Sequence, residues 1–295
     1  GNAFTDSVLT VFQPNTDTKM DYFDKAETWD RATLETVQLA RLKTTIQQAS
    51  RAPFYAKRLA EAGVSADNLR SLEDIRRIPF TSKDDLRSQY PYGLATVPHS
   101  EFVRMHCSSG TTGTPVAVCY TQPDINSWAD LMARCLYMAG VRKDDVFQNM
   151  SGYGLFTGGL GIHFGAERLG CMTIPAGAGN SKRQLKLVKD FGTTVAHILP
   201  SYALHLGTTL IEEGEDPKAL SLRIACVGAE PYTEETRRRI EALFDMKVYN
   251  SYGLSEMNGP GVAFECQYQN GLHLWEDAYL LEIIDPNTGK LVPDG

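Results

Sequence analysis

The chain has 295 residues, of which 42% are hydrophobic and 22% are charged, a composition that is typical of a soluble globular protein with one large or two small domains. Its formal net charge of −7 argues against a nucleic-acid partner, because such proteins usually carry a basic stripe. No apolar run approaches the roughly 20 residues of a membrane-spanning helix, so we expect no membrane partner.

The first 21 residues are expected to be flexible, and residues 22–100 to form a helical lead-in. Apolar residues recur with helical spacing between positions 28 and 61. Ser82 followed three residues later by Asp85 predicts the capped start of a further short helix.

Between residues 101 and 261 the pattern alternates between strand and helix, which predicts an α/β core with a mainly parallel sheet and helices on both faces. The expected strands are Val103–Cys107, Val116–Tyr120, Val146–Met150, Cys171–Ile174, Thr194–Ile198, Ile224–Val227 and Met246–Ser251. The expected helices are Asp124–Ala139, Phe164–Leu169, Lys182–Phe191, Ser201–Glu213 and Glu234–Phe244.

In residues 262–295 the alternation of strand and helix stops, and the pattern predicts antiparallel strands. The expected strands are Val262–Cys266, Leu272–Trp275 and Leu280–Ile284, and Asp285–Gly289 has the composition of a hairpin turn.

Six cysteines are spread along the chain without a Cys-x-x-Cys pair. Cys119, Cys171 and Cys226 lie in apolar, strand-like surroundings, where a buried free thiol is the usual state. We therefore expect a reducing, cytoplasmic location.

The most informative segment is 108–115, which reads Ser-Ser-Gly-Thr-Thr-Gly-Thr-Pro. It offers backbone amides and short hydroxyls, and its glycines permit the conformations that wrap closely around phosphate oxygens. It is not a Walker A loop, because Thr114 and Pro115 follow Gly113 where that motif needs a lysine. The plain alternative is a polar surface turn.

Two further segments support a nucleotide site. Residues 252–256 read Tyr-Gly-Leu-Ser-Glu and follow a short strand, and 228–231 read Gly-Ala-Glu-Pro after an apolar strand. In this order the three segments resemble the adenylate-forming superfamily. The neighbouring segments Phe80–Arg87, Tyr153–Gly161 and Trp275–Asp277 narrow the resemblance to the phenylacetate–CoA ligases.

The resemblance implies that residues 22–295 form an acyl-CoA synthetase-like N-terminal AMP-binding domain, with 262–295 as the start of a β-barrel. It implies ATP-dependent activation of a phenylacetate-like aryl acid to an acyl-adenylate, followed by transfer to coenzyme A, with Mg²⁺ as metal. Members of the family continue into a C-terminal lid that carries a catalytic lysine. That lid is absent here, so we expect this chain to be inactive alone; whether it forms a homodimer is left open.

The resemblance also assigns roles to residues of this sequence. Glu256 and Thr111 are the expected catalytic residues, and Glu256 is the expected Mg²⁺ ligand, because carboxylate oxygen suits this ion beside phosphates. Thr114 departs from the family, in which many members carry lysine. The expected nucleotide-binding residues are Ser108, Ser109, Gly110, Thr111, Thr112, Gly113, Thr114, Gly228, Ala229, Glu230, Pro231, Asn250, Ser251, Tyr252, Gly253 and Ser255.

The stretch 153–161 is the expected acid pocket. Tyr153 and Phe156 would supply aromatic walls, Thr157 adjoins them, and Gly158 and Gly159 would leave room for a flat ring. The alternative is a flexible glycine-rich loop.

Cys266 and His273 face each other across an expected hairpin, and a thiolate with an imidazole suits zinc. The remaining ligands would have to come from elsewhere. The alternative is a buried cysteine and a surface histidine.

Two other functions remain open at this stage. One is an adenylate-forming ligase with a different acceptor, such as a deazaflavin cofactor or a carrier protein. The other is a nucleotide-binding module without catalytic activity.

Overall fold

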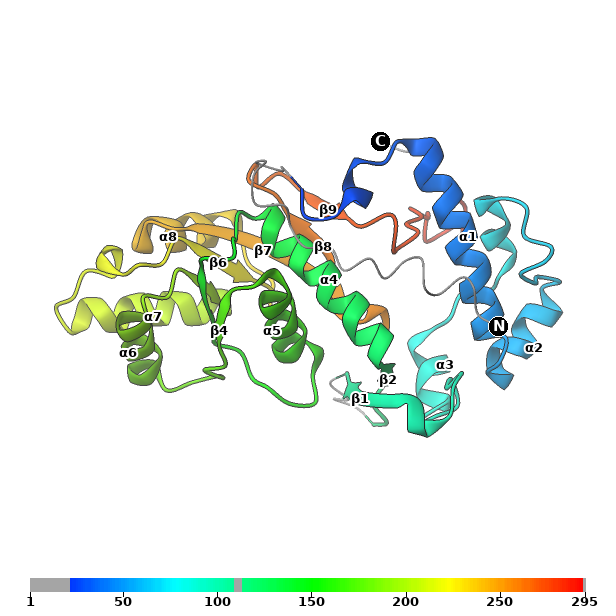
Figure 1. Cartoon of the computed structure of the whole chain (residues 1–295), viewed down its shortest axis with the longest axis horizontal. Coiled ribbons are helices and arrows are strands. Elements are labelled where there is room, and N and C mark those ends of the chain that lie inside the picture. The colour runs from blue at the N-terminus through cyan, green and yellow to red at the C-terminus, as the bar shows by residue number, and fades with distance from the viewer. Residues whose placement is uncertain (1–21, 109–112, 294–295) are drawn as a thin grey trace.

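The computed structural model describes residues 22–108 and 113–293. The segment expected to be flexible, 1–21, lies outside the described residues. Figure 1 shows an elongated molecule with the lead-in helices, in blue and cyan, at one end and the α/β core at the other.

The lead-in contains short helices around a small apolar cluster of Ile46, Leu59, Val64 and Leu69. The predicted cap is confirmed, because the Asp85 amide donates to Ser82 Oγ at 3.1 Å and the Ser82 amide donates to Asp85 Oδ2 at 2.8 Å. The elements are η1 (Lys25–Thr28), α1 (Arg31–Ala49), α2 (Pro53–Glu61), η2 (Leu72–Arg77), α3 (Lys83–Ser88) and η3 (His99–Glu101).

The next two strands, β1 (Phe102–Cys107) and β2 (Ala117–Thr121), form an antiparallel ribbon of their own. Cys107 pairs with Ala117, so the expected phosphate loop is the connection of this hairpin. The strands were expected at these positions, but they lie outside the main sheet.

The main sheet has seven strands in the order β4-β3-β5-β6-β7-β8-β9. The first five in this order run parallel, and β8 and β9 are antiparallel additions at one edge. The mainly parallel sheet is therefore confirmed. The strands are β3 (Val146–Asn149), β4 (Met172–Ile174), β5 (Val195–His197), β6 (Ile224–Val227), β7 (Lys247–Leu254), β8 (Gly259–Glu265) and β9 (Leu272–Leu274).

Helices cover both faces of this sheet, as predicted. Alternate strand residues enter two apolar clusters: Ile224 and Cys226 belong to one, and Ala225 and Val227 to the other. Helices α4 (Gln122–Met138) and α5 (Thr157–Leu169) pack into the first cluster. The second cluster takes α6 (Ser181–Phe191), α7 (Pro200–Glu212) and α8 (Glu234–Phe244), and the remaining short helices are η4 (Pro217–Ala219) and η5 (Ser255–Met257).

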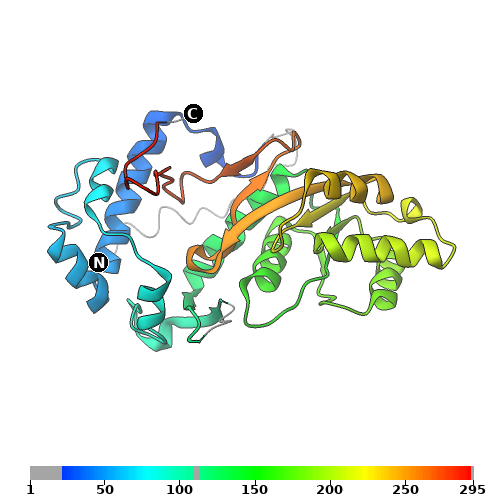
Figure 2. The same cartoon turned by 180° about the vertical axis from the view of Figure 1, so that it is seen from behind.

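The expected strand Leu280–Ile284 is wrong. The segment makes a single isolated bridge, from Ile284 to Leu291. The turn between them does form, with the Gly289 amide donating to the Asp285 carbonyl at 2.8 Å. Strands β7 and β8, gold and orange in Figure 2, reach from the core toward the lead-in. In the described part of the chain, β8 and β9 continue the main sheet rather than close a barrel.

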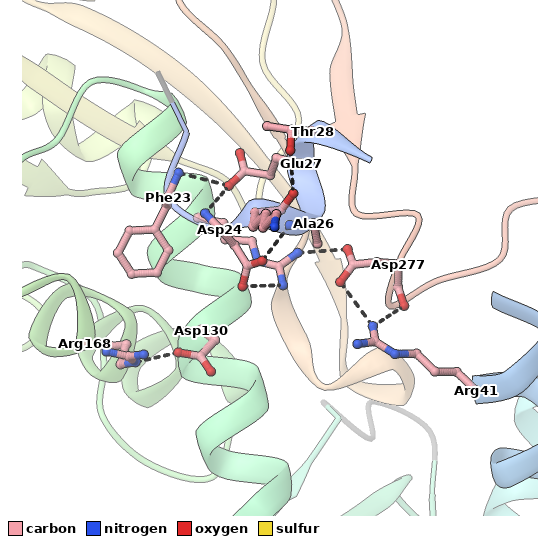
Figure 3. Close-up of polar contacts among 11 residues, drawn as sticks. Phe23, Asp24, Ala26, Glu27, Thr28, Arg41, Asp130, Arg168 and Asp277 are labelled. Carbon is pink, nitrogen blue, oxygen red and sulfur yellow. Dashed lines mark hydrogen bonds and ion pairs between the residues drawn. The ribbon is translucent and has the colours of Figure 1, made fainter. Parts of the chain in front are cut away.

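A charged cluster joins the lead-in to the core (Figure 3). Buried Asp277 accepts from Arg134 Nη1 of α4 at 2.8 Å and from Arg41 Nη1 of α1 at 3.1 Å. Arg134 also donates to Asp24 Oδ2 at 3.1 Å. Glu276 adds a bidentate contact to Arg31, at 2.8 and 3.1 Å. The sequence motif that ends at Asp277 therefore anchors α1.

All six cysteines are free thiols in this structure. In the described residues no helix is both long enough and apolar enough to cross a membrane.

Candidate nucleotide and acid site

A cleft of about 1280 Å³ lies at the carboxyl ends of β3, β5, β6 and β7. This is the edge at which open parallel sheets usually bind ligands. The start of α5 and the first residue of α3 also line the cleft. A second cavity of about 560 Å³ lies between the lead-in and the β1–β2 ribbon, and Glu256 lines both.

The expected phosphate loop reaches the cleft through Ser108. Its amide donates to the Val116 carbonyl at 2.9 Å, and its Oγ accepts from the Val116 amide at 3.2 Å, which closes the base of the loop. Gly113 has φ 144° and is exposed, as is Thr114. The expected residues Ser109, Gly110, Thr111 and Thr112 lie outside the described residues.

The loop after β6 is close-packed and strained. A side chain at Gly228 would place Cβ 2.6 Å from Ser251 Oγ and 3.1 Å from the Ser251 carbonyl oxygen, so Ser251 would have to move to admit it. Ala229 has φ 66°, a conformation that non-glycine residues seldom adopt and that often marks a functional site. Glu230 caps α7 by accepting from the Ser201 amide at 2.7 Å and from Ser201 Oγ at 3.1 Å. Pro231 completes this wall of the cleft.

The neighbouring strand β7 also lines the cleft, through Asn250, Ser251, Tyr252 and Gly253. The Tyr252 ring is 50% exposed and so presents a flat face to the cleft. A Cβ at Gly253 would lie 2.0 Å from the Gly259 carbonyl oxygen, so glycine is required for the pairing with β8. The Asn250 amide is held by Glu265 Oε2 at 2.7 Å.

Glu256 lies in η5, directly after Ser255, which also lines the cleft. Its Oε1 is buried and has no hydrogen-bond partner among the described residues. A buried carboxylate oxygen without a donor is costly unless a cation approaches it. The donor chemistry of Glu256 therefore fits Mg²⁺, which prefers oxygen ligands.

Lys83 is a site residue that sequence reasoning missed. It is the first residue of α3, it lines the cleft, and its Nζ lies 3.8 Å from Glu256 Oε1. The positive charge that Thr114 does not supply thus comes to the cleft from the lead-in. The signal was present, because the Ser82 cap places Lys83 at the start of a helix.

The structure brings only part of the expected acid pocket to the cleft. Phe156, Thr157, Gly158 and Gly159 line the cleft, but Tyr153 is not among its lining residues. The Tyr153 hydroxyl instead lies 2.9 Å from His163 Nδ1.

The two glycines also differ, because the stretch becomes helix α5 at Thr157. A Cβ at Gly158 would meet nothing within 4 Å, whereas one at Gly159 would lie 2.2 Å from the Gly152 carbonyl oxygen. Gly159 is therefore required for packing, and Gly158 is the one that leaves room in the cleft.

A polar cluster at the base of the cleft was also missed. Asn149 and His197 end the neighbouring strands β3 and β5, and Ser151 follows. His197 Nδ1 lies 2.9 Å from Asn149 Oδ1 and 3.1 Å from Ser151 Oγ. Polar residues at the carboxyl ends of parallel strands were the available signal.

The described residues contain no group of three or more His, Cys, Asp or Glu side chains that could hold a metal. In the sheet, His273 pairs with Phe264, two residues before Cys266, and His273 is exposed. The zinc prediction therefore has no support from the described residues.

Known proteins match this chain over most of its length. A phenylacetate-coenzyme A ligase of Pseudomonas putida is 48% identical over 274 residues, which are 92% of this chain and 62% of the relative. A Thermus thermophilus protein of the same name is 46% identical over 278 residues, covering 94% of this chain and 62% of that relative. The chain thus spans less than two thirds of these relatives.

Solved structures agree with the sequence comparison. A 2-hydroxyisobutyryl-CoA ligase, in an open conformation with 2-HIB-AMP and CoA, superposes with a TM-score of 0.87 at 30% identity. The match covers 96% of this chain and 63% of that structure. Residues 26–295 match the family described as AMP-binding enzyme. The chain therefore belongs to the AMP-binding enzyme family.

Proposed function

We propose that the protein activates a phenylacetate-like aryl acid with ATP and transfers it to coenzyme A. The acid's carboxylate oxygen attacks the α-phosphorus of ATP, and pyrophosphate leaves with the electrons of the broken bond. The thiolate of coenzyme A then attacks the acyl carbon, and AMP leaves. The observation that carries the proposal is the pairing of Lys83 with the buried oxygen of Glu256 in the cleft.

In this proposal the cleft holds the nucleotide between the loop after β6 and the face of Tyr252. Lys83 neutralises charge on the phosphates, and Glu256 is the residue that would hold Mg²⁺, which supplies further charge neutralisation when bound. The acid lies beside Gly158 and Phe156, within reach of the α-phosphate. Catalysis is then mainly positioning and charge stabilisation.

The acceptor and the substrate are the finer parts of the proposal. The support for coenzyme A and for phenylacetate is the names of the relatives. A different acceptor, such as a deazaflavin or a carrier protein, would leave the adenylation step unchanged, and a nucleotide-binding module would lack that step.

The test is phenylacetate-dependent exchange of pyrophosphate into ATP by the full-length protein. We expect Glu256→Gln to reduce exchange by about a hundredfold, the usual scale for losing one charge-stabilising group. Lys83→Ala should reduce it similarly. Arg87→Ala on the same helix is the matched control, because Arg87 pairs with Asp84 and does not line the cleft. Unchanged exchange in Glu256→Gln would remove the carboxylate from the mechanism.

A further inference from the structure

The polar cluster at the base of the cleft has a defined hydrogen-bond direction. Asn149 Nδ2 donates to the Gly159 carbonyl at 2.8 Å, so its Oδ1 is the atom turned toward His197 and Ser151. Ser151 Oγ lies 2.8 Å from the same Oδ1. An amide oxygen can only accept, so His197 Nδ1 and Ser151 Oγ must each donate to it.

These hydrogen bonds determine which tautomer the His197 ring adopts. Its Nδ1 faces Asn149 Oδ1 at 2.9 Å and must carry a hydrogen. Burial lowers the pKa of His197 to about 4, so the ring is neutral near pH 7. In the neutral ring a hydrogen on Nδ1 leaves Nε2 as an acceptor.

His197 lines the cleft, and no described residue donates a hydrogen bond to Nε2. The hydroxyls nearby in the sequence have other partners, because Ser201 Oγ donates to Glu230 and the Tyr202 hydroxyl contacts Ser181 Oγ. Nε2 is therefore an acceptor in the cleft lining whose partner has to come from the ligand or from water. An apolar ring over this atom would leave it without a partner, which is unfavourable in a buried site.

We propose that His197 selects acids that carry a hydroxyl or amino donor on the ring, with Nε2 accepting the hydrogen bond. The proposal rests on the proposed function, since it names the class of acid for the same cleft. Sites built to hydrogen-bond a substrate hydroxyl discriminate strongly against the analogue that lacks it, because the site's polar atom is then unpaired. Asn149 and Ser151 are positioning residues that fix the tautomer.

The test compares acids of one scaffold on the full-length protein with ATP and Mg²⁺. Binding of phenylacetate, of its 2-, 3- and 4-hydroxy derivatives and of the matching methoxy derivatives is measured by calorimetry. A methoxy group accepts but cannot donate, so it controls for size and polarity. We expect one hydroxy isomer to bind at least about tenfold more tightly than phenylacetate and than its own methoxy derivative.

The variant His197→Met removes the acceptor and keeps an apolar side chain of similar reach. It should abolish the hydroxy-over-methoxy ratio while still binding phenylacetate. His205→Asn is the matched control, because His205 also lines the cleft but stacks on Tyr202 and is exposed, so the ratio should persist.

Equal affinities for hydroxy and methoxy acids in the wild type would overturn the role of His197, and this comparison needs no variant to fold. A ratio that persists in His197→Met would overturn it as well. Failure of every aryl acid to bind would instead overturn the proposed function, so the two failures are separable.

Discussion

The helical lead-in, 22–100, and the α/β core, taken here together with the segment that follows it to residue 293, are each held by apolar packing but are joined to one another mainly by charge. The core has two large apolar clusters on the faces of its sheet, and the lead-in has one small cluster of its own. Between them, Phe23 packs against the core, and the other contacts are chiefly ion pairs such as Arg41–Asp277 and Lys83–Glu256. The lead-in is thus a separately packed body that delivers one cation to the cleft.

Breaking a buried ion pair should therefore have different effects in the core and at the junction with the lead-in. Arg237 and Glu265 are both buried in the core, joined at 2.5 and 2.7 Å between α8 and β8. Glu265→Leu leaves the buried guanidinium with only Glu234 and the Val248 carbonyl, and it also removes the acceptor of the Asn250 amide. It should therefore reduce the global free energy of unfolding by about 3–5 kcal/mol. Urea denaturation measures this. Lys186→Ala, which breaks an exposed pair with Asp190, should change it by less than about 1 kcal/mol.

At the junction, Asp277→Leu should loosen the lead-in more than it destabilises the core. The variant leaves Arg134 buried without this partner, and Arg41 of α1 keeps only the Asp277 backbone carbonyl. The local cost is about 3 kcal/mol, the low end for a broken buried pair, because Arg134 keeps Asp24. Hydrogen exchange should rise in α1 and stay unchanged in β5 and β6. Equal increases in both regions would mean that the two bodies unfold together.

Within the core, substitutions of the two neighbouring glycines of α5 should distinguish an effect on packing from an effect on pocket volume. Gly159→Ala should reduce the free energy of unfolding by about 1–3 kcal/mol, because its Cβ would overlap the Gly152 carbonyl oxygen. Gly158→Ala should leave stability unchanged or raise it by up to about 1 kcal/mol, since alanine favours helix. It should still weaken acid binding, because Gly158 lines the cleft. Thermal unfolding and calorimetry on both variants check this, and similar destabilisation by both would contradict it.

A pH dependence of stability should also arise within the core. Burial holds the pKa of His197 at about 4, below its ordinary 6.5. Between these values the unfolded state binds more protons, so the stability of the wild type falls as the pH is lowered through this window. The slope is at most about 1.4 kcal/mol per pH unit. His197→Met should lack this contribution, and denaturation curves from pH 7 to 4 compare the two. If stability depends on pH in the same way in both proteins, the protons taken up on unfolding bind to groups other than His197.

Local signals in the sequence predicted much of the fold. The cap formed by Ser82 and Asp85 and the apolar strand Ile224–Val227 depend on neighbouring residues, and both are confirmed. The sequence did not predict that β1 and β2 form a separate ribbon, because strand pairing depends on contacts between residues that are distant in the chain. The start of α5 at Thr157 was missed because glycine disfavours helix locally, whereas here its lack of a side chain is needed for packing.

The site shows the same division. The segments 228–231 and 252–256 were recognisable as motifs, and the structure brings both to one cleft. Lys83 and His197 carried no pattern of their own, since each matters only through a partner distant in the chain. Glu256 and Asn149 are these partners, and only the folded chain shows them.

Because ion pairs join the lead-in to the core, the position of Lys83 should depend on the salt concentration. Dissolved ions screen exposed charges over about 8 Å at physiological ionic strength and over less at higher salt. The pairs Arg31–Glu276 and Arg76–Glu282 are partly exposed and should weaken as salt is added, whereas the pair of Arg41 in α1 with buried Asp277 should weaken less. Lys83 would then be carried by a lead-in that is held at one fixed point and free to pivot about it. Ionic strength would thus change the fraction of time that the Lys83 ammonium lies in the cleft.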